Sequence, residues 1–175
     1  MLLVLGGSQG ARALNRAMVD AAPALKAWGQ PLRIVHQSGA HELDAVRAGY
    51  AQAGLSAEVV AFIDDMAGAY GQARLIVSRA GASAVNEIVC ARRASILVPI
   101  PGTSGDHQLK NARRVERAGA GQVIEQAALT GAALAGTIRT LLAQPARLDE
   151  MERACDAIFG GDSAERLVQE CRTLL

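Results

Sequence analysis

Short apolar runs alternate along the chain with longer stretches in which apolar residues recur every three or four positions. Six runs, bounded by glycine, proline or polar residues, resemble strands buried on both faces of a parallel sheet. They span 2–5, 32–36, 58–63, 75–78, 95–100 and 122–124. The stretches at helical spacing span 11–22, 41–53, 65–71, 84–91, 107–118, 132–143, 146–159 and 163–174. This alternation predicts an α/β fold, a Rossmann-like, doubly wound, six-stranded parallel sheet in the order 3-2-1-4-5-6 with right-handed crossovers.

No linker, repeat or low-complexity tract interrupts the chain, so the pattern predicts a single domain over residues 1–175. The best local break is GGDS, residues 160–163, which we interpret as a loop before a last helix capped by Asp162 or Ser163. The apolar stripe of that helix suits packing on the domain's own sheet, which we favour, or docking on something outside the chain.

Composition narrows the range of functions. The chain has 175 residues, a net charge of +1 and only 3% aromatic residues. It therefore has neither the positive electrostatic potential nor the aromatic surface for base stacking that nucleic-acid-binding proteins use. Cys90, Cys155 and Cys171 show no CxxC spacing, so we interpret them as reduced apolar residues of a cytosolic protein and expect no metal. No apolar run approaches the roughly 20 residues of a membrane span. The opening MLLVLGG lacks the basic lead of a signal peptide and predicts a strand.

The first turn that can carry chemistry is GGSQG, residues 6–10, between the first strand and the first helix. Backbone N–H groups at such a helix start, together with the Ser8 hydroxyl, suit a phosphate, although the glycines can equally serve close packing. The spacing is neither GxGxxG nor a P-loop, because Gly6 and Gly7 are adjacent and no GK[ST] follows. The second strand leads into VHQSG without an acid for a ribose, so we reject a dinucleotide oxidoreductase and expect no cofactor.

The second such turn is SRAGAS, residues 78–83, after the fourth strand. In the predicted order the first and fourth strands are neighbours and the strand order reverses between them. The loops 6–10 and 79–83 should therefore face each other across one crevice, where two helix starts suit a diphosphate. Ser83 is predicted to cap the helix. Glu87 lies one residue beyond the acidic position of a capping box. Its carboxylate either interacts favourably with the helix dipole or accepts hydrogen bonds from both hydroxyls of a ribose.

Two further segments carry polar groups. In FIDDM, residues 62–66, Asp64 or Asp65 is predicted to cap a short helix, while the backbone of Ile63 can pair with the edge of a base.

In GDHQLKNA, residues 105–112, Asp106 is a predicted cap. Gln108 and Asn111 lie three apart on one helix face, and their amides offer the donors and acceptors that sugar hydroxyls require. We assign no role to His107, which is interpreted as solvated or structural.

Five motifs occur in one order along the chain: GGSQGARALN, FIDDM, SRAGASAVNE, VPIPGTSGDHQLKNA and AGAGQVIEQ. Together they resemble the C-terminal half of the MurG family, bacterial transferases that move N-acetylglucosamine from UDP-N-acetylglucosamine (UDP-GlcNAc) to lipid I and so make lipid II. The resemblance runs from Leu2 to about Leu174. It implies one half of a two-domain GT-B glycosyltransferase, with the donor held mainly by this half, and inverting transfer without a tightly held metal.

The resemblance also implies roles for individual residues. The first turn would contact the diphosphate, Ile63 would read uracil through its backbone, Glu87 would hold the ribose, and Gln108 with Asn111 would bind the sugar hydroxyls. The implied donor-binding residues are Gly7, Ser8, Gln9, Gly10, Ile63, Met66, Ala82, Ser83, Ala84, Val85, Asn86, Glu87, Gln108 and Asn111. No catalytic residue is implied within this chain.

The chain departs from the family pattern in several places. Ala84 stands where the family commonly has Thr, ARRAS replaces a Gly-Leu-Pro turn, and PGTSGDHQ replaces a loop with His and Asp. We also expect the N-terminal acceptor domain, with its general base, to be absent from this chain. Because transfer needs an acceptor hydroxyl that is positioned and deprotonated, we predict donor binding with little turnover by this chain alone. The complete enzyme would be cytoplasmic, peripheral on the inner face of the bacterial plasma membrane.

Two alternatives stay open. The chain can be the donor half of a two-chain UDP-GlcNAc transferase whose membrane-bound partner supplies the acceptor half, and a co-purifying partner would favour this. It can also be a non-catalytic nucleotide-sugar-binding module, which would bind the donor yet give no transfer when an acceptor domain is supplied.

Overall fold

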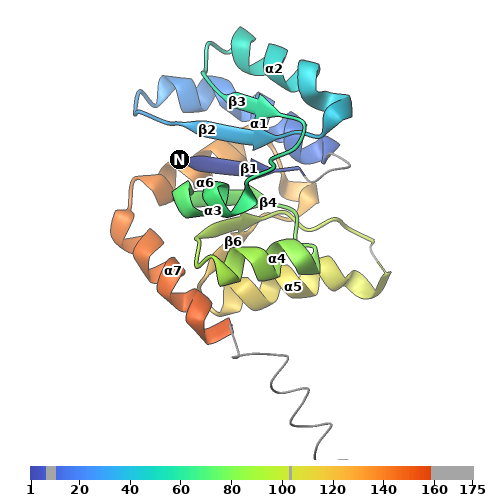
Figure 1. Cartoon of the computed structure of the whole chain (residues 1–175), viewed down its shortest axis with the longest axis vertical. Helices are drawn as coiled ribbons and strands as arrows, with labels where there is room; N and C mark the ends of the chain where they lie inside the picture. Colours follow the sequence, from blue (N-terminus) through green and yellow to red (C-terminus); the bar gives the residue numbers. More distant parts are fainter. Residues whose placement is uncertain (7–10, 103, 159–175) are drawn as a thin grey trace, which may run out of the picture.

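A computed structural model describes residues 1–6, 11–102 and 104–158. Within them, six strands form one parallel sheet in the order β3-β2-β1-β4-β5-β6 (Figure 1), which confirms the predicted topology. The strands are β1 Leu2–Leu5, β2 Ile34–Gln37, β3 Glu58–Val60, β4 Leu75–Ser78, β5 Ser95–Leu97 and β6 Gly121–Val123. The α-helices are α1 Arg12–Ala27, α2 Leu43–Gln52, α3 Met66–Gln72, α4 Ala82–Cys90, α5 His107–Arg117, α6 Gly131–Leu142 and α7 Pro145–Ile158. Short 3-10 turns lie at η1 Ala40–Glu42, η2 Ser104–Asp106 and η3 Gln126–Ala128.

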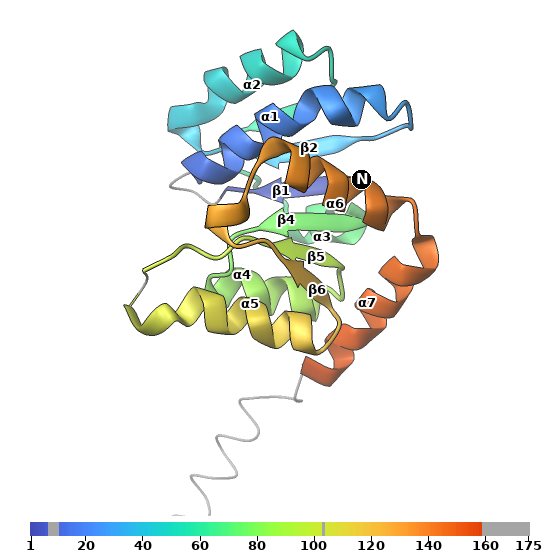
Figure 2. The same cartoon turned by 180° about the vertical axis from the view of Figure 1, so that it is seen from behind.

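Helices cover both faces of the sheet. Helices α3, α4 and α5 lie on the face seen in Figure 1, and α1 and α6 lie on the face seen in Figure 2. Successive strand side chains point to opposite faces, so Leu2 and Val4 of β1 enter one apolar cluster while Leu3 and Leu5 enter the other. Two aliphatic cores therefore hold the sheet between its helices, as the near absence of aromatic residues requires.

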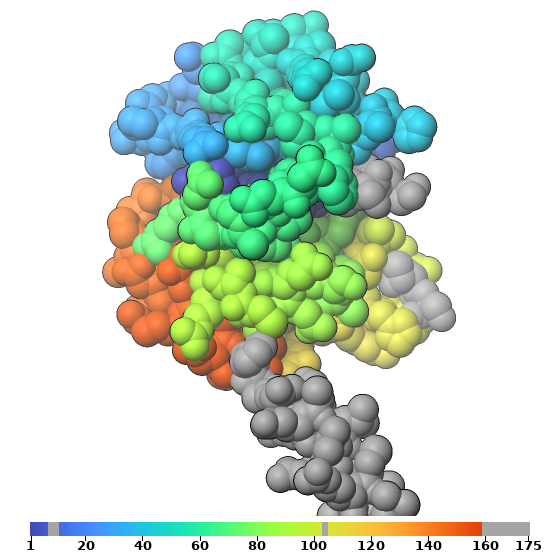
Figure 3. Space-filling model, viewed as in Figure 1, coloured from blue at the N-terminus to red at the C-terminus, as the bar shows by residue number. Residues whose placement is uncertain are grey.

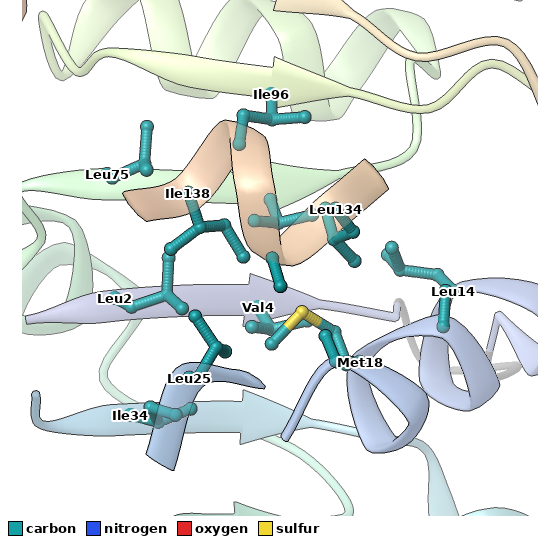
Figure 4. Close-up of a cluster of buried hydrophobic side chains, with 14 of the residues drawn as sticks. Leu2, Val4, Leu14, Met18, Leu25, Ile34, Leu75, Ile96, Leu134 and Ile138 are labelled. Carbon is teal, nitrogen blue, oxygen red and sulfur yellow. The ribbon is translucent and has the colours of Figure 1, made fainter. Parts of the chain in front are cut away.

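The core on the α1 and α6 side is shown in Figure 4. Side chains of α1, including Met18, meet Val4 of β1 and Leu134 and Ile138 of α6, and all of these are fully buried. Helix α7 joins the two cores, because its Met151 lies in this cluster and its Cys155 lies in the other. No helix in the described ranges is both long and apolar enough to cross a bilayer.

Element boundaries differ from prediction where local chemistry ends the pairing. Strand β5 stops at Leu97 instead of continuing to residue 100, although Val98 N still donates to Ser78 O at 2.8 Å. Pro99 and Pro101 have no N–H, so the ladder cannot continue through them. Helix α1 runs past Pro23 to Ala27, and the burial of Leu25 explains the extra turn. The predicted last helix and the loop before it lie outside the described residues.

Candidate functional site

The candidate site lies where the strand order reverses. The carboxyl ends of β1 and β4 are level, because Leu5 pairs in register with Ser78. After Leu5 the chain continues into α1 on one face, and after Ser78 it continues into α4 on the other, since the two helices bury their apolar sides in different cores. In doubly wound folds, connections that diverge in this way leave a crevice above the sheet edge where ligands usually bind, and we call this position the crevice.

The first turn is held by a backbone contact that only glycine permits. Gly6 N donates to Gln37 O at 2.8 Å, and a Cβ on Gly6 would lie 2.7 Å from that same oxygen. The predicted phosphate ligands Gly7, Ser8, Gln9 and Gly10 lie outside the described residues. The structure therefore places the start of this turn at the crevice and leaves its remainder a prediction.

The second turn corrects one expectation. Helix α4 begins at Ala82 with Gly81 as its N-cap, and Val85 N closes the first helical bond on Gly81 O at 3.0 Å. Ser83 therefore stands inside the first turn, exposed, and the prediction that it caps the helix is wrong. The first turn of α4 presents its unpaired N–H groups at the crevice, as a helix N-terminus does.

The implied donor-binding residues of α4 differ in burial. Ala82, Ser83 and Asn86 are exposed, and Ala84 is half-buried. Val85 is buried in the core that α4 shares with α3 and α5. Val85 thus fixes the helix against the sheet, while its neighbours remain open to a ligand.

Arg79 brings a positive charge to the same loop. Its Nη1 donates to Val98 O at 3.1 Å, while its buried Nε has no hydrogen-bond partner among the described residues. Burial lowers the pKa of this guanidinium from its ordinary value. A half-buried arginine with a backbone carbonyl as its partner has charge left to offer an anion.

Glu87 has a partner that the sequence reasoning missed. The hydroxyl of Tyr70 on α3 donates to Glu87 Oε2 at 2.9 Å. Figure 3 shows α3, in green, lying against the yellow-green α4 on this face of the molecule. Tyr70 is buried, whereas Glu87 is exposed. The two residues are 17 positions apart on different helices, so no local pattern could have linked them.

Helix α5 is tied to both neighbouring loops by the two predicted sugar-binding amides. Gln108 Oε1 accepts from Ile100 N at 3.1 Å, and Asn111 Nδ2 donates to Ala80 O at 3.2 Å. Asp106 is the N-cap residue of α5 as predicted, but its side chain makes no capping bond because its backbone is left-handed at φ 51°. The Gln108 NH₂ group has no partner in the part of the chain that the structure describes.

The segment after β3 contains one of the predicted helix caps. Asp65 caps α3 through a bond from Gly68 N to Oδ1 of 2.8 Å, which confirms one of the two proposed caps. No hydrogen bond joins the backbone of Ile63 to another described residue. Ile63 and Met66 both pack at the edge of the core that contains Tyr70. The Ile63 backbone is therefore open, while its side chain and that of Met66 belong to the same apolar cluster as Tyr70.

A hollow of about 390 Å³ adjoins α5, between the loop after β5 and the segment after β6. Its lining includes Pro99, Ile100, Leu109 and Gln126. No pattern in the sequence predicts this hollow, because its walls come from separate segments. Within the described ranges, no group of three or more His, Cys, Asp or Glu residues is gathered in a way that could hold a metal ion.

A family model, the glycosyltransferase family 28 C-terminal domain, matches residues 1–167. The chain belongs to this family.

Curated relatives of this family 28 domain share a single name. The protein of Syntrophotalea carbinolica is 47% identical over 99% of this chain and that of Myxococcus xanthus is 43% identical over 99%. Each is called UDP-N-acetylglucosamine–N-acetylmuramyl-(pentapeptide) pyrophosphoryl-undecaprenol N-acetylglucosamine transferase. The chain covers 49% and 45% of these two proteins, so it spans about half the length of the curated relatives it matches.

Solved structures agree with the family 28 assignment. The crystal structure of Acinetobacter baumannii MurG matches with a TM-score of 0.79 and 40% identity, covering 88% of this chain and 44% of that one. The calicheamicin glycosyltransferase CalG4, at 20% identity and a TM-score of 0.65, shares the fold. The predicted resemblance to the C-terminal half of MurG is confirmed, and so is the Rossmann-like half of a GT-B fold.

Proposed function

We propose that this family 28 domain, over residues 1–175, is the donor-binding domain of an inverting transferase that moves N-acetylglucosamine from UDP-GlcNAc to lipid I in peptidoglycan synthesis. The observation that carries the proposal is the in-register pairing of the carboxyl ends of β1 and β4, from which the chain continues to α1 and α4 on opposite faces of the sheet, in a chain 47% identical to a named N-acetylglucosamine transferase. Lipid I would be held by an N-terminal acceptor domain or by a partner chain.

The diphosphate would lie between the starts of α1 and α4. Unpaired N–H groups and the positive dipole end of a helix favour an anion, and two such ends suit two phosphates. Gly7, Ser8, Gln9 and Gly10 would supply donors from one side, and the first turn of α4 would supply them from the other. Arg79 would add a charge that increases the stability of the departing UDP.

The two ends of the donor would be held by different elements. The open backbone of Ile63 would pair with uracil beside Met66, and Glu87 would accept the ribose hydroxyls. The free NH₂ group of Gln108 and the Asn111 side chain would bind the N-acetylglucosamine hydroxyls. Because each side chain is also tied to the protein, its position is set before the donor arrives, which lowers the entropy cost of binding.

Calorimetry tests the proposal. We expect the chain to bind UDP-GlcNAc and UDP, UDP-glucose more weakly, and NAD not at all. Glu87→Ala should weaken UDP binding by about 1–3 kcal/mol, the scale of a lost charged hydrogen bond. Glu150→Ala is the matched control, because Glu150 is an exposed acid that pairs with Arg147 on α7, away from the proposed site. No heat with UDP-GlcNAc at saturating concentration, from folded protein, would remove the proposal.

Turnover is a separate measurement. The chain alone should transfer little sugar to a lipid I analogue, because this domain would supply donor binding and leaving-group stabilisation only. Adding an acceptor domain from a named relative should raise the rate. A donor-saturated mixture that stays inactive would favour a non-catalytic binding module. The complete protein would work on the inner face of the plasma membrane, where its lipid acceptor lies.

A further inference from the structure

Tyr70 and Glu87 form a bond with unequal surroundings. The Tyr70 side chain is buried among the apolar residues that α3, α4 and α5 share, and its hydroxyl emerges at the edge to meet Glu87 Oε2 at 2.9 Å. The Glu87 side chain belongs to an exposed residue of α4. A flexible surface carboxylate is thus fixed at one oxygen by a rigid, buried ring.

The helix that carries Tyr70 is itself held in place. Arg93 Nε donates to Tyr70 O at 2.9 Å and Arg93 Nη2 donates to Gly71 O at 3.1 Å. Tyr70 O also accepts from Ala73 N at 3.2 Å, so Arg93 reinforces the C-terminal end of α3, where helical carbonyls run short of partners. Arg93 also lies 3.7 Å from Glu152 of α7. A helix as short as α3 owes its position to such anchors rather than to its own propensity.

The Tyr70 hydroxyl acts as a donor in this pair. Burial, the hydrogen bond to Glu87 and the charge of Glu87 all raise the pKa of Tyr70 above its usual value. The phenol therefore keeps its proton at neutral pH, and the carboxylate accepts. An ionised carboxylate has about four acceptor positions on its two oxygens, so the bond from Tyr70 leaves Oε1 and part of Oε2 available.

We propose that Tyr70 is a positioning residue for the donor's ribose: it holds the Glu87 carboxylate in the orientation that accepts the two ribose hydroxyls. This inference rests on the proposed function. A freely rotating glutamate would lose rotamer entropy on binding a diol, and a carboxylate already fixed at one oxygen loses less. Tyr70 should therefore affect nucleotide affinity only when Glu87 is present.

Nucleotide analogues separate positioning from simple packing. Tyr70→Phe keeps the buried ring and removes the hydroxyl. It should weaken UDP and UDP-GlcNAc alike, by about 3- to 10-fold, the effect of one hydrogen bond. Binding of 2′,3′-dideoxy-UDP, which has no ribose diol, should be the same for wild type and Tyr70→Phe. In a Glu87→Ala background the Tyr70→Phe change should add nothing to the loss of UDP affinity, because the two residues act as one unit.

A stability control separates a loss of nucleotide affinity from a general loss of fold stability. Ile138→Val removes a buried methyl group from the core on the opposite face, and it should lower stability while leaving all nucleotide affinities unchanged. Equal losses for UDP and dideoxy-UDP in Tyr70→Phe, or a full loss in the Glu87→Ala background, would show a purely structural role and overturn the inference. So would UDP binding that depends on Glu87 but not on Tyr70. Absence of UDP binding by the wild type would instead overturn the proposed function itself.

Discussion

His36 Nε2 lies 3.0 Å from Oδ1 of Asn15, and both groups are fully buried. The Asn15 NH₂ group donates to Ser38 O at 2.9 Å, so its oxygen must face the imidazole and accept from Nε2–H. The other ring nitrogen, Nδ1, then accepts from the Tyr50 hydroxyl at 3.0 Å. This relay joins α1, β2 and α2 in one tautomer of a neutral histidine, directly behind the Gly6 turn.

The relay predicts a stability that depends on pH. Burial lowers the pKa of His36 from 6.5 to about 4 in the folded chain. Between these values the unfolded chain binds a proton that the folded chain does not, so His36 makes its full contribution above pH 6.5 and loses it as the pH falls toward 4. The total loss is on the order of 3 kcal/mol.

Urea unfolding at several pH values measures this loss. His36→Gln should be less stable at pH 7 but should show a shallower fall between pH 6.5 and 4.5, because the titrating group is gone. Carboxylates contribute to both proteins, so the difference between the two slopes isolates His36. Protonation of the His36 imidazole near pH 6.5, followed by NMR in the folded wild type, would contradict the prediction.

Gly6 predicts a second effect on stability, through steric contact. A Cβ on Gly6 would lie 2.7 Å from Gln37 O and 3.1 Å from Asn15 Oδ1, so Gly6→Ala must displace backbone or the relay. We expect a loss of about 1–3 kcal/mol in the free energy of unfolding. Gly136→Ala in α6 is the matched control, because its Cβ would meet nothing within 4 Å. It should gain about 0.5–1 kcal/mol from helix propensity. Two losses of the same size would contradict the steric argument.

The strand order, and with it the neighbouring ends of β1 and β4, could be predicted from the sequence because burial forces them. Continuous apolar runs separated by helical spacing leave few right-handed arrangements, and the reversal between the first and fourth strands follows from the order. Asp65 was predictable as a cap because a cap depends on residues two or three positions away. Gly81 was not, since a serine at position 83 satisfies the same local rule.

The spacing of hydrophobic and polar residues could not predict contacts between elements that are far apart in the sequence. Tyr70 follows a capped turn and shows no sign of its bond to Glu87, which requires α3 and α4 to pack side by side. Asn15 and His36 each read as ordinary polar positions, and only the fold brings them together. The alternation of strands and helices therefore predicts which strand ends are neighbours, while the contacts that hold the side chains of the site in place depend on how separate elements pack.

Arg92 predicts a third effect, at the end of α4. Its backbone is left-handed at φ 50°, in the position after the C-cap where glycine is usual. Arg92 N donates to Val89 O and Arg93 N to Ile88 O, the two bonds of a Schellman motif, so the turn forms without its glycine. Arg92→Gly should be more stable than Arg92→Ala by about 1 kcal/mol, because both lose the same side chain and only glycine relieves the strain.

Arg92 also forms a largely exposed ion pair with Asp156 at 2.7 Å, and both Arg92 variants lose it. The strength of this pair therefore affects the stability of each variant relative to wild type. Such surface pairs contribute about 0–1 kcal/mol, so Asp156→Ala measures this contribution with the strained turn left intact. Thermal and urea unfolding of the three variants give the comparison. Equal stability of Arg92→Gly and Arg92→Ala would show that the left-handed turn carries no strain.

Gln108 predicts a difference between two ligands. Its Oε1 is held by Ile100 N, which directs the NH₂ group away from that loop and leaves it free to donate. Gln108→Ala should weaken UDP-GlcNAc binding by about 1–2 kcal/mol and leave UDP binding nearly unchanged, because UDP has no sugar to lose a hydrogen bond. Calorimetry with both ligands gives the two values. The loss of the Ile100 contact in the same variant can shift the loop after β5, so Gln108→Glu supplies a second comparison: it keeps an acceptor for Ile100, removes the NH₂ donors and adds a negative charge. Because that charge would repel the diphosphate of both ligands, the ratio of UDP-GlcNAc affinity to UDP affinity is the readout. A fall in this ratio in both variants is the expected pattern, and an unchanged ratio with a loss shared by UDP in Gln108→Ala would move Gln108 from sugar recognition to support of the loop.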